Sequence, residues 1–205
     1  KPIHAVYHAS NGGVMAAGTE AWSMQSVPYL RAKLDGSKKW NNLFRLPLTT
    51  TDQLGAVLKQ VEGAYGNDHS RFRWVRTIDA AALKNALLIF RNSNTLPTQV
   101  KVLERGASGR VMALEILSEP NQISQVLKLD QIRRVLRDLP STLFVVNESK
   151  KGVWEFSGGG FGHGAGLSQA GAIDLARRGW KVSQILSYYY PGTTYGTLQE
   201  LPKAP

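Results

Sequence analysis

The segment Phe156–Ala172 constrains the fold more than any other part of the chain, because it crowds glycines around one histidine. It reads Phe-Ser-Gly-Gly-Gly-Phe-Gly-His-Gly-Ala-Gly-Leu-Ser-Gln-Ala-Gly-Ala, and the histidine is His163. Glycine adopts positive φ angles and lets a backbone pass close to another surface, at an entropic cost that the rest of the fold must offset. The segment therefore predicts a backbone wall against which a bulky ligand or another strand lies. Small residues from Ala170 to Ala176 then predict a helix that ends near Gly179.

Two familiar motifs resemble this segment only in part. Glycines ahead of a helix suit phosphate groups, but the Gly-x-x-x-x-Gly-Lys-Ser/Thr pattern of a phosphate-binding loop is missing. The stretch Gly166–Ala170 approaches the Gly-x-Ser-x-Gly motif of serine hydrolases, with alanine at its last position. An α/β-hydrolase also needs a histidine after its serine, whereas every histidine of this chain precedes Ser168. Both interpretations are therefore rejected.

The charge and composition of the chain limit the classes of binding partner and of metal site that we expect. The formal charge is +10, from 25 Lys and Arg residues against 15 Asp and Glu residues. This surplus favours nucleic acid, anionic lipid or an acidic cell-wall polymer, and it also fits a solvated basic surface without a specific partner. The absence of cysteine excludes disulfides and thiolate metal sites, and we expect neither a metal nor a cofactor. Apolar runs such as Ala86–Phe90 are far shorter than the ~20 residues of a membrane span, so no span is expected in this chain.

The pattern of apolar residues predicts an α+β fold, in which mixed or antiparallel sheets with hairpins accompany several single helices. Thr50, Asp79 and Asp130 are expected to cap helices, the first of them through a capping box with Gln53. Strands are expected at residues 3–7, 71–78, 100–104, 110–117, 143–146 and 153–156. The third helix is expected to end before Pro140.

The stretch from Gly160 to Thr193 resembles the C-terminal signature of the SpoIID/LytB family. That signature reads Gly-x-Gly-His-Gly-Val-Gly-Met-Ser-Gln-x-Gly-Ala, then a helix, then Ile-Leu-x-His-Tyr-Tyr-Pro-Gly-Thr. Here Ala165, Leu167 and Tyr188 replace its Val, Met and His. Earlier segments resemble the family in the same order: Tyr7–Gly13, Glu20–Trp22, Pro28–Leu30, Ser108–Arg110, Ile132–Arg133 and Pro140–Phe144.

This resemblance implies a SpoIID-like fold in which residues 1–205 form the C-terminal part of a SpoIID/LytB domain. Residues of about 36–70 depart most from the family and are expected to be an insertion. The chain opens in a strand-like run without a signal-peptide pattern, so we expect it to be a fragment. The family's catalytic glutamate lies in a Ser-Glu-Met-Pro-like segment that this sequence does not contain. Glu20 is therefore not assigned as a catalytic acid.

The resemblance also implies a function in the bacterial cell envelope, outside the cytoplasmic membrane. SpoIID-like proteins are lytic transglycosylases that bind and cleave the glycan strands of peptidoglycan, with a carboxylic acid as proton donor. LytB-like relatives are described as modifiers of cell-wall amidases, which makes a non-catalytic peptidoglycan-binding module the alternative. Whether this chain is part of an enzyme stays open at this point. No nucleic-acid motif accompanies the clustered arginines, so we expect them to be solvated and to aid attachment to the wall.

His163 is the first candidate for a catalytic residue. Held in a glycine frame formed by Gly162 and Gly164, its ring suits hydrogen bonds to sugar hydroxyls or the orientation of a carboxylate. The alternative is a packed histidine bonded to the backbone. The two flanking glycines are candidates for the wall of the substrate site.

The other candidate substrate-binding residues lie in two short stretches. Ser168 and Gln169 begin the predicted helix, where they either cap it or bind the acetamido and hydroxyl groups of a sugar. His8 and Ser10 lie in a second glycine-bearing turn and face the same groove unless they only stabilise that turn. Trp22 is a weaker candidate for stacking on a sugar ring, and the favoured alternative is an ordinary core tryptophan.

Overall fold

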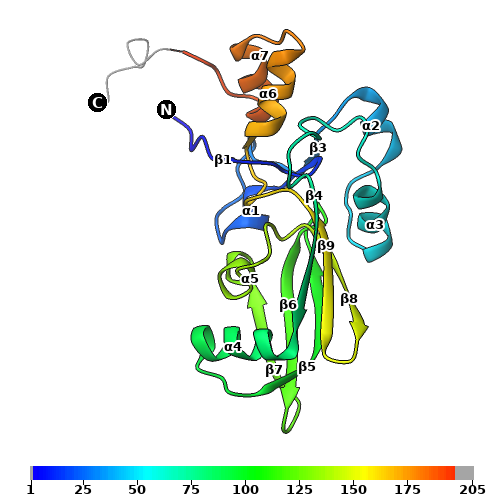
Figure 1. Cartoon of the computed structure of the whole chain (residues 1–205). Helices are drawn as coiled ribbons and strands as arrows, with labels where there is room; N and C mark the ends of the chain where they lie inside the picture. Colours follow the sequence, from blue (N-terminus) through cyan, green and yellow to red (C-terminus); the bar gives the residue numbers. More distant parts are fainter. Residues whose placement is uncertain (1, 197–205) are drawn as a thin grey trace, which may run out of the picture.

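The computed structural model describes residues 2–196, which form two sheets of three strands, two pairs of short strands and single helices (Figure 1). The elements in chain order are β1 (Tyr7–His8), β2 (Val14–Met15), α1 (Gly18–Ala21), β3 (Lys33–Leu34), α2 (Lys38–Leu43), α3 (Thr51–Lys59), β4 (Arg73–Asp79), α4 (Ala80–Arg91), β5 (Leu96–Arg105), β6 (Val111–Glu119), β7 (Ile123–Lys128), α5 (Asp130–Val135), β8 (Phe144–Lys150), β9 (Val153–Gly159), β10 (Leu167–Ser168), α6 (Gln169–Arg177) and α7 (Val182–Tyr189).

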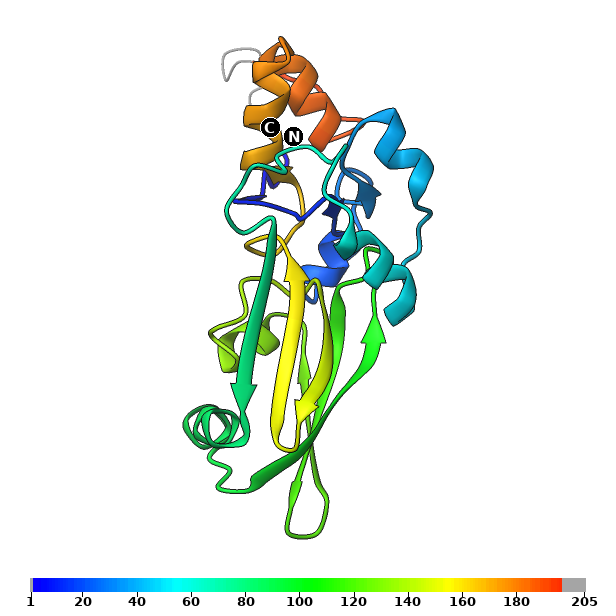
Figure 2. The same ribbon diagram turned by 45° about the vertical axis from the view of Figure 1, so that its right-hand side comes forward.

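Two antiparallel sheets of three strands, β4-β9-β8 and β5-β6-β7, make up one end of the molecule. Apolar side chains from both sheets, α4 and α5 share one core, which contains Trp74, Ile78, Leu83, Leu87, Leu114, Ile116, Leu127, Ile132, Phe144, Trp154 and Phe156. Helices α6 and α7 lie at the opposite end, and the chain between β9 and β10 runs through the waist that joins the two ends (Figures 1 and 2). The α+β fold class is confirmed.

Local capping signals predicted several elements correctly. The hydroxyl of Thr50 accepts a hydrogen bond from the N–H of Gln53, and the side-chain oxygen of Gln53 accepts one from the N–H of Thr50, so the capping box of α3 is confirmed. Asp79 caps α4 by accepting from the N–H of Ala82 at 2.8 Å. The hairpins β5–β6 and β8–β9 also form where the alternating pattern placed them.

Two expectations at element ends were wrong. The strand expected at residues 3–7 is reduced to Tyr7–His8, because its partner β10 is only two residues long before the chain turns into α6. Asp130 is the first residue of α5 and not its cap; the cap position is Leu129, at φ 49°. The carboxylate of Asp130 instead forms ion pairs with Arg133 and Arg134, and α5 ends at Val135.

Residues 36–70 form α2, α3 and their connections, and they share a second apolar core with Val14, Leu34 and Phe72. Trp40 is fully buried there between Val14, Leu34 and Val57, and its indole N–H donates to the carbonyl of Gly13 at 3.0 Å. That this segment is an insertion stays a prediction. Within residues 2–196, no helix has both the length and the apolar character required to cross a membrane.

Candidate functional site

The glycine-rich segment does form a wall, and what lies against it is the N-terminal part of the same chain. Strands β1 and β10 pair in parallel, so that His8 stands beside Ser168. Further bridges join Ser10 to Phe161 and Ala16 to Ala165. The contact is close enough that a Cβ on Gly160, where φ is 83°, would lie 2.6 Å from the carbonyl oxygen of Ser10. The glycines therefore bring two backbones together at the waist.

His163 lies in this wall with both ring nitrogens occupied by backbone groups. Its Nδ1 accepts a hydrogen bond from the N–H of Ala165 at 3.2 Å, so the proton is on Nε2, which donates to the carbonyl oxygen of Tyr7 at 2.9 Å. Partial burial lowers the pKa of His163 to about 4, and the ring is neutral at physiological pH. What the imidazole leaves free for a ligand is its face and edge, not a hydrogen-bonding nitrogen.

His8 lies beside His163 and carries its proton on Nδ1, whereas His163 carries its proton on Nε2. The two ring centroids are 5.3 Å apart. The Nδ1–H of His8 donates to the carbonyl oxygen of Ala165 at 3.1 Å, while its Nε2 is buried without a hydrogen-bond partner. Burial, with smaller contributions from His163 and Arg110, holds the pKa of His8 well below its ordinary value.

Trp22, His163 and His8 form an aromatic cluster, in which Trp22 and His8 each contact His163. The ring centroid of Trp22 lies 4.5 Å from that of His163, and the side chain is half-buried. The neighbouring Glu20 is buried, and its two oxygens accept the N–H groups of Ala17 at 2.6 Å and Ser108 at 2.8 Å. Glu20 therefore joins α1 to the β5–β6 turn and presents no free oxygen to a ligand.

Beneath the histidines lies Arg110, whose side chain is completely buried. It donates to the carbonyl oxygens of Val14 at 2.9 Å and Asn11 at 3.1 Å, and burial lowers its pKa to about 10. A Cβ on Gly164 would collide with this guanidinium group. The requirement for glycine at this position thus comes from a packed arginine and not from a ligand.

The remaining candidates lie in the same strip, with different exposures. The hydroxyl of Ser168 caps α6 by accepting from the N–H of Gly171 at 3.2 Å, and that of Ser10 accepts from the N–H of Gly12 at 3.4 Å. Gly162 has φ 110° and passes close to the Cβ of His8. Only Gln169 is exposed. The structure therefore brings all these residues together and buries most of their polar atoms. Their roles in substrate binding stay predictions.

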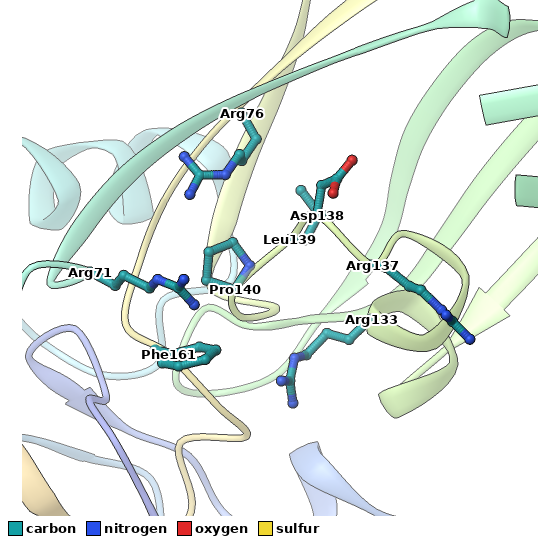
Figure 3. A pocket seen from close by; sticks show the side chains of 8 residues that line it. All are labelled: Arg71, Arg76, Arg133, Arg137, Asp138, Leu139, Pro140 and Phe161. Atoms are coloured by element: carbon teal, nitrogen blue, oxygen red, sulfur yellow. The ribbon is translucent and has the colours of Figure 1, made fainter. Parts of the chain in front are cut away.

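Two hollows open on the surface around the cluster. One, of about 360 Å³, is bordered by Trp22 and by residues of β7 and α5, including Lys128, Asp130, Gln131 and Arg134. The other, of about 260 Å³, lies around Phe161 and Pro140 (Figure 3). The ion pair between Asp130 and Arg133, at 3.7 Å, forms part of the wall between them. Within residues 2–196, no three His, Cys, Asp or Glu side chains gather in a way that would hold a metal ion.

Sequence reasoning missed two buried polar groups. One is Arg110, which follows a glycine in a hairpin turn and carries no local sign of burial. The other is Asp35, fully buried, which accepts hydrogen bonds from Asn11 at 2.6 Å and from the hydroxyl of Tyr189 at 3.1 Å. Burial raises the pKa of Asp35. A charged residue between apolar neighbours, as in Leu34-Asp35-Gly36, was the available signal.

Comparison with known families and proteins adds two findings. The model of a family described as a domain of unknown function (DUF8618) matches residues 16–166, most of the chain. The chain belongs to this family. The DUF8618 match contains Trp22, Arg110 and His163, and it ends just before β10, α6 and α7.

The chain is also similar to a protein named amidase enhancer from Bacillus subtilis (strain 168), with 29% identity over 216 aligned residues. The alignment covers 94% of this chain and 29% of the amidase enhancer. The chain thus spans less than a third of that protein's length.

Proposed function

We propose that this chain binds the glycan strands of peptidoglycan in the bacterial cell envelope and modifies the action of a cell-wall amidase there. The resemblance of its glycine-rich segment to the SpoIID/LytB signature supports a cell-wall function. The similarity to a protein named amidase enhancer favours the amidase-modifying members of that family over the transglycosylases.

One observation carries the choice of binding over cleavage: the acid next to the cluster is not available as a proton donor. Glycan cleavage by a lytic transglycosylase needs a carboxylic acid that faces the glycosidic oxygen. Both oxygens of Glu20 are occupied by backbone N–H groups inside the protein. The carboxylate that borders the hollow beside Trp22 is Asp130, and it is paired with two arginines. Neither Glu20 nor Asp130 is therefore free to act as a proton donor beside this cluster.

The hollow beside Trp22 is suited to a sugar. An indole ring offers an apolar face for the C–H side of a pyranose, and it is held in place here by the ring of His163 behind it. Around it, Ser23, Lys128 and Gln131 supply hydrogen-bonding groups for hydroxyl and acetamido substituents. His163 then acts as a positioning residue for the indole, which fits a ring whose nitrogens are both bonded to backbone.

Calorimetric titration with neutral N-acetylglucosamine oligomers and with peptide-stripped glycan strands tests the proposal. Trp22→Ala should weaken binding by about fivefold to tenfold, the value of a well-placed aromatic contact. The matched control is Tyr195→Ala, an exposed aromatic outside the cluster, which should leave affinity unchanged. Equal affinity of Trp22→Ala and the unaltered protein would contradict the proposed site.

A second assay separates the two activities. The chain is mixed with peptidoglycan and a purified cell-wall amidase, and the release of stem peptides is followed with and without it. We expect stimulation that Trp22→Ala reduces. Formation of 1,6-anhydro-muramyl ends by this chain alone, without the amidase, would overturn the non-catalytic interpretation.

A further inference from the structure

The hollow around Phe161 concentrates positive charge from separate parts of the chain. Its lining residues are Arg71, Arg76, Arg133, Arg137, Asp138, Leu139, Pro140 and Phe161. Arg71 precedes β4, Arg76 belongs to β4, and Arg133 belongs to α5. The fold therefore gathers four arginines and one acid around about 260 Å³ of space.

Three of these arginines converge. In Figure 3, the guanidinium groups of Arg71, Arg76 and Arg133 point toward the space around Pro140 and Phe161, and that of Arg137 points away. The guanidinium group of Arg137 instead lies 4.8 Å from the centre of the Phe90 ring.

The positive charge in the hollow is poorly balanced by the protein. None of the ion pairs in residues 2–196 involves Arg71 or Arg76, and Arg133 reaches Asp130 only at 3.7 Å. The Nε of Arg133 is moreover buried without a hydrogen-bond partner. Like charges held together repel one another, and an anion between them relieves this repulsion. Planar guanidinium groups match the oxygens of phosphate with paired hydrogen bonds.

We propose that this hollow binds phosphate groups of a phosphodiester polymer that carries no bases, such as a chain of polyol phosphates. Nucleic acid is disfavoured because base stacking needs a free aromatic face. The aromatic ring of the hollow, Phe161, already carries the guanidinium of Arg71 at 4.2 Å from its centre. The inference goes beyond the proposed glycan binding and does not depend on it.

Titration with synthetic poly(glycerol phosphate) tests this site. Arg71→Ala combined with Arg76→Ala should weaken binding about a hundredfold, since each of the two charge-assisted contacts contributes about tenfold. Lys150→Ala combined with Lys151→Ala, at the exposed turn between β8 and β9, removes the same charge and should change affinity less than about twofold. Equal losses in the two double variants would show an unspecific effect of net charge and overturn the proposal.

The chemistry of the ligand is tested with two further polymers. Poly-glutamate of matched length should bind at least about tenfold more weakly, because a carboxylate offers fewer oxygens to three converging arginines. Single-stranded DNA should not bind more tightly than poly(glycerol phosphate); tighter binding would make the site a nucleic-acid site and overturn the proposal. The arginine double variant should still bind neutral N-acetylglucosamine oligomers like the unaltered protein, which also shows that it is folded. Conversely, Trp22→Ala should retain its affinity for poly(glycerol phosphate).

Discussion

His8 and His163 occupy the same buried strip with complementary needs for a neutral ring. The Nδ1 of His163 has to accept a hydrogen bond from a backbone N–H, so a proton there would face another donor. A proton on Nε2 of His8 would be buried without an acceptor. Both rings are therefore compatible with this packing only in their neutral forms, although histidine alone is half-charged near pH 6.5.

We predict that the protein becomes less stable in mild acid because of these two histidines. The folded-state pKa of His163 is about 4, and that of His8 is well below 6.5, so the unfolded chain takes up protons first as the pH falls. Their contribution to stability is complete above about pH 6.5 and is lost as the pH falls toward 4, with up to about 1.4 kcal/mol per pH unit from His8. Urea denaturation at about pH 7.5 and about pH 5 measures this slope.

Substitutions separate these histidines from other titrating groups. His8→Asn keeps a donor for the carbonyl of Ala165 and removes the titration, so it should flatten the dependence of unfolding free energy on pH. The control is His4→Asn, at an exposed position, which should leave the slope unchanged. An unaltered slope in His8→Asn would contradict this account.

At the scale of elements, Ser168 at the start of α6 has two predicted roles, as the cap of the helix or as a residue that binds sugar. Ser168 caps the helix through its bond to Gly171, and it is 1% exposed. We predict that Ser168→Ala lowers the free energy of unfolding by about 1 kcal/mol, as the loss of a helix cap does, without changing glycan affinity measured on folded protein. Gln169→Ala, at the exposed next position, should leave stability within about 0.5 kcal/mol of the unaltered protein. Reduced glycan affinity in folded Ser168→Ala would instead support its predicted role in sugar binding.

The elements also show how far the sequence reaches. Two structures that depend on neighbours in the chain were predicted from the sequence, the helix caps Thr50 with Gln53 and Asp79 with Ala82, whereas the cap expected at Asp130 was wrong. Where a structure depends on a segment far along the chain, the sequence did not predict it. The length of β1 depends on β10, which lies far along the chain.

The candidate site follows the same division. The glycine-rich segment predicted a backbone wall. Its residues alone did not distinguish a ligand from another part of the chain as the neighbour of that wall. The buried contacts of Arg110 with Val14 and Asn11 join residues almost a hundred positions apart, so no local pattern contains them. The same holds for the convergence of Arg71, just before β4, and Arg133 in α5, since these residues lie far apart in the sequence.

Across the whole molecule, Asp35 joins the N-terminal turn to the C-terminal helices. Its carboxylate is fully buried and accepts from the side chain of Asn11 on one side and from the hydroxyl of Tyr189 in α7 on the other. Apolar packing of Met15 and Leu30 with Leu175 surrounds this link. The DUF8618 match stops before α6 and α7, so the link joins the matched part to a part beyond it.

We predict that Tyr189→Phe lowers the free energy of unfolding by about 1–3 kcal/mol, because a buried carboxylate loses one of its donors without any replacement by water. The ring keeps its volume, so apolar packing is unchanged and the loss belongs to the hydroxyl. Urea denaturation followed by tryptophan fluorescence gives the value, with Tyr195→Phe, 63% exposed, as the control that should show no change. A double-mutant cycle with Asp35→Asn should then give effects that do not add, since the two groups are in direct contact. Additive effects, or a Tyr189→Phe protein as stable as its control, would mean that the contact between Tyr189 and Asp35 does not help to hold α7 in place.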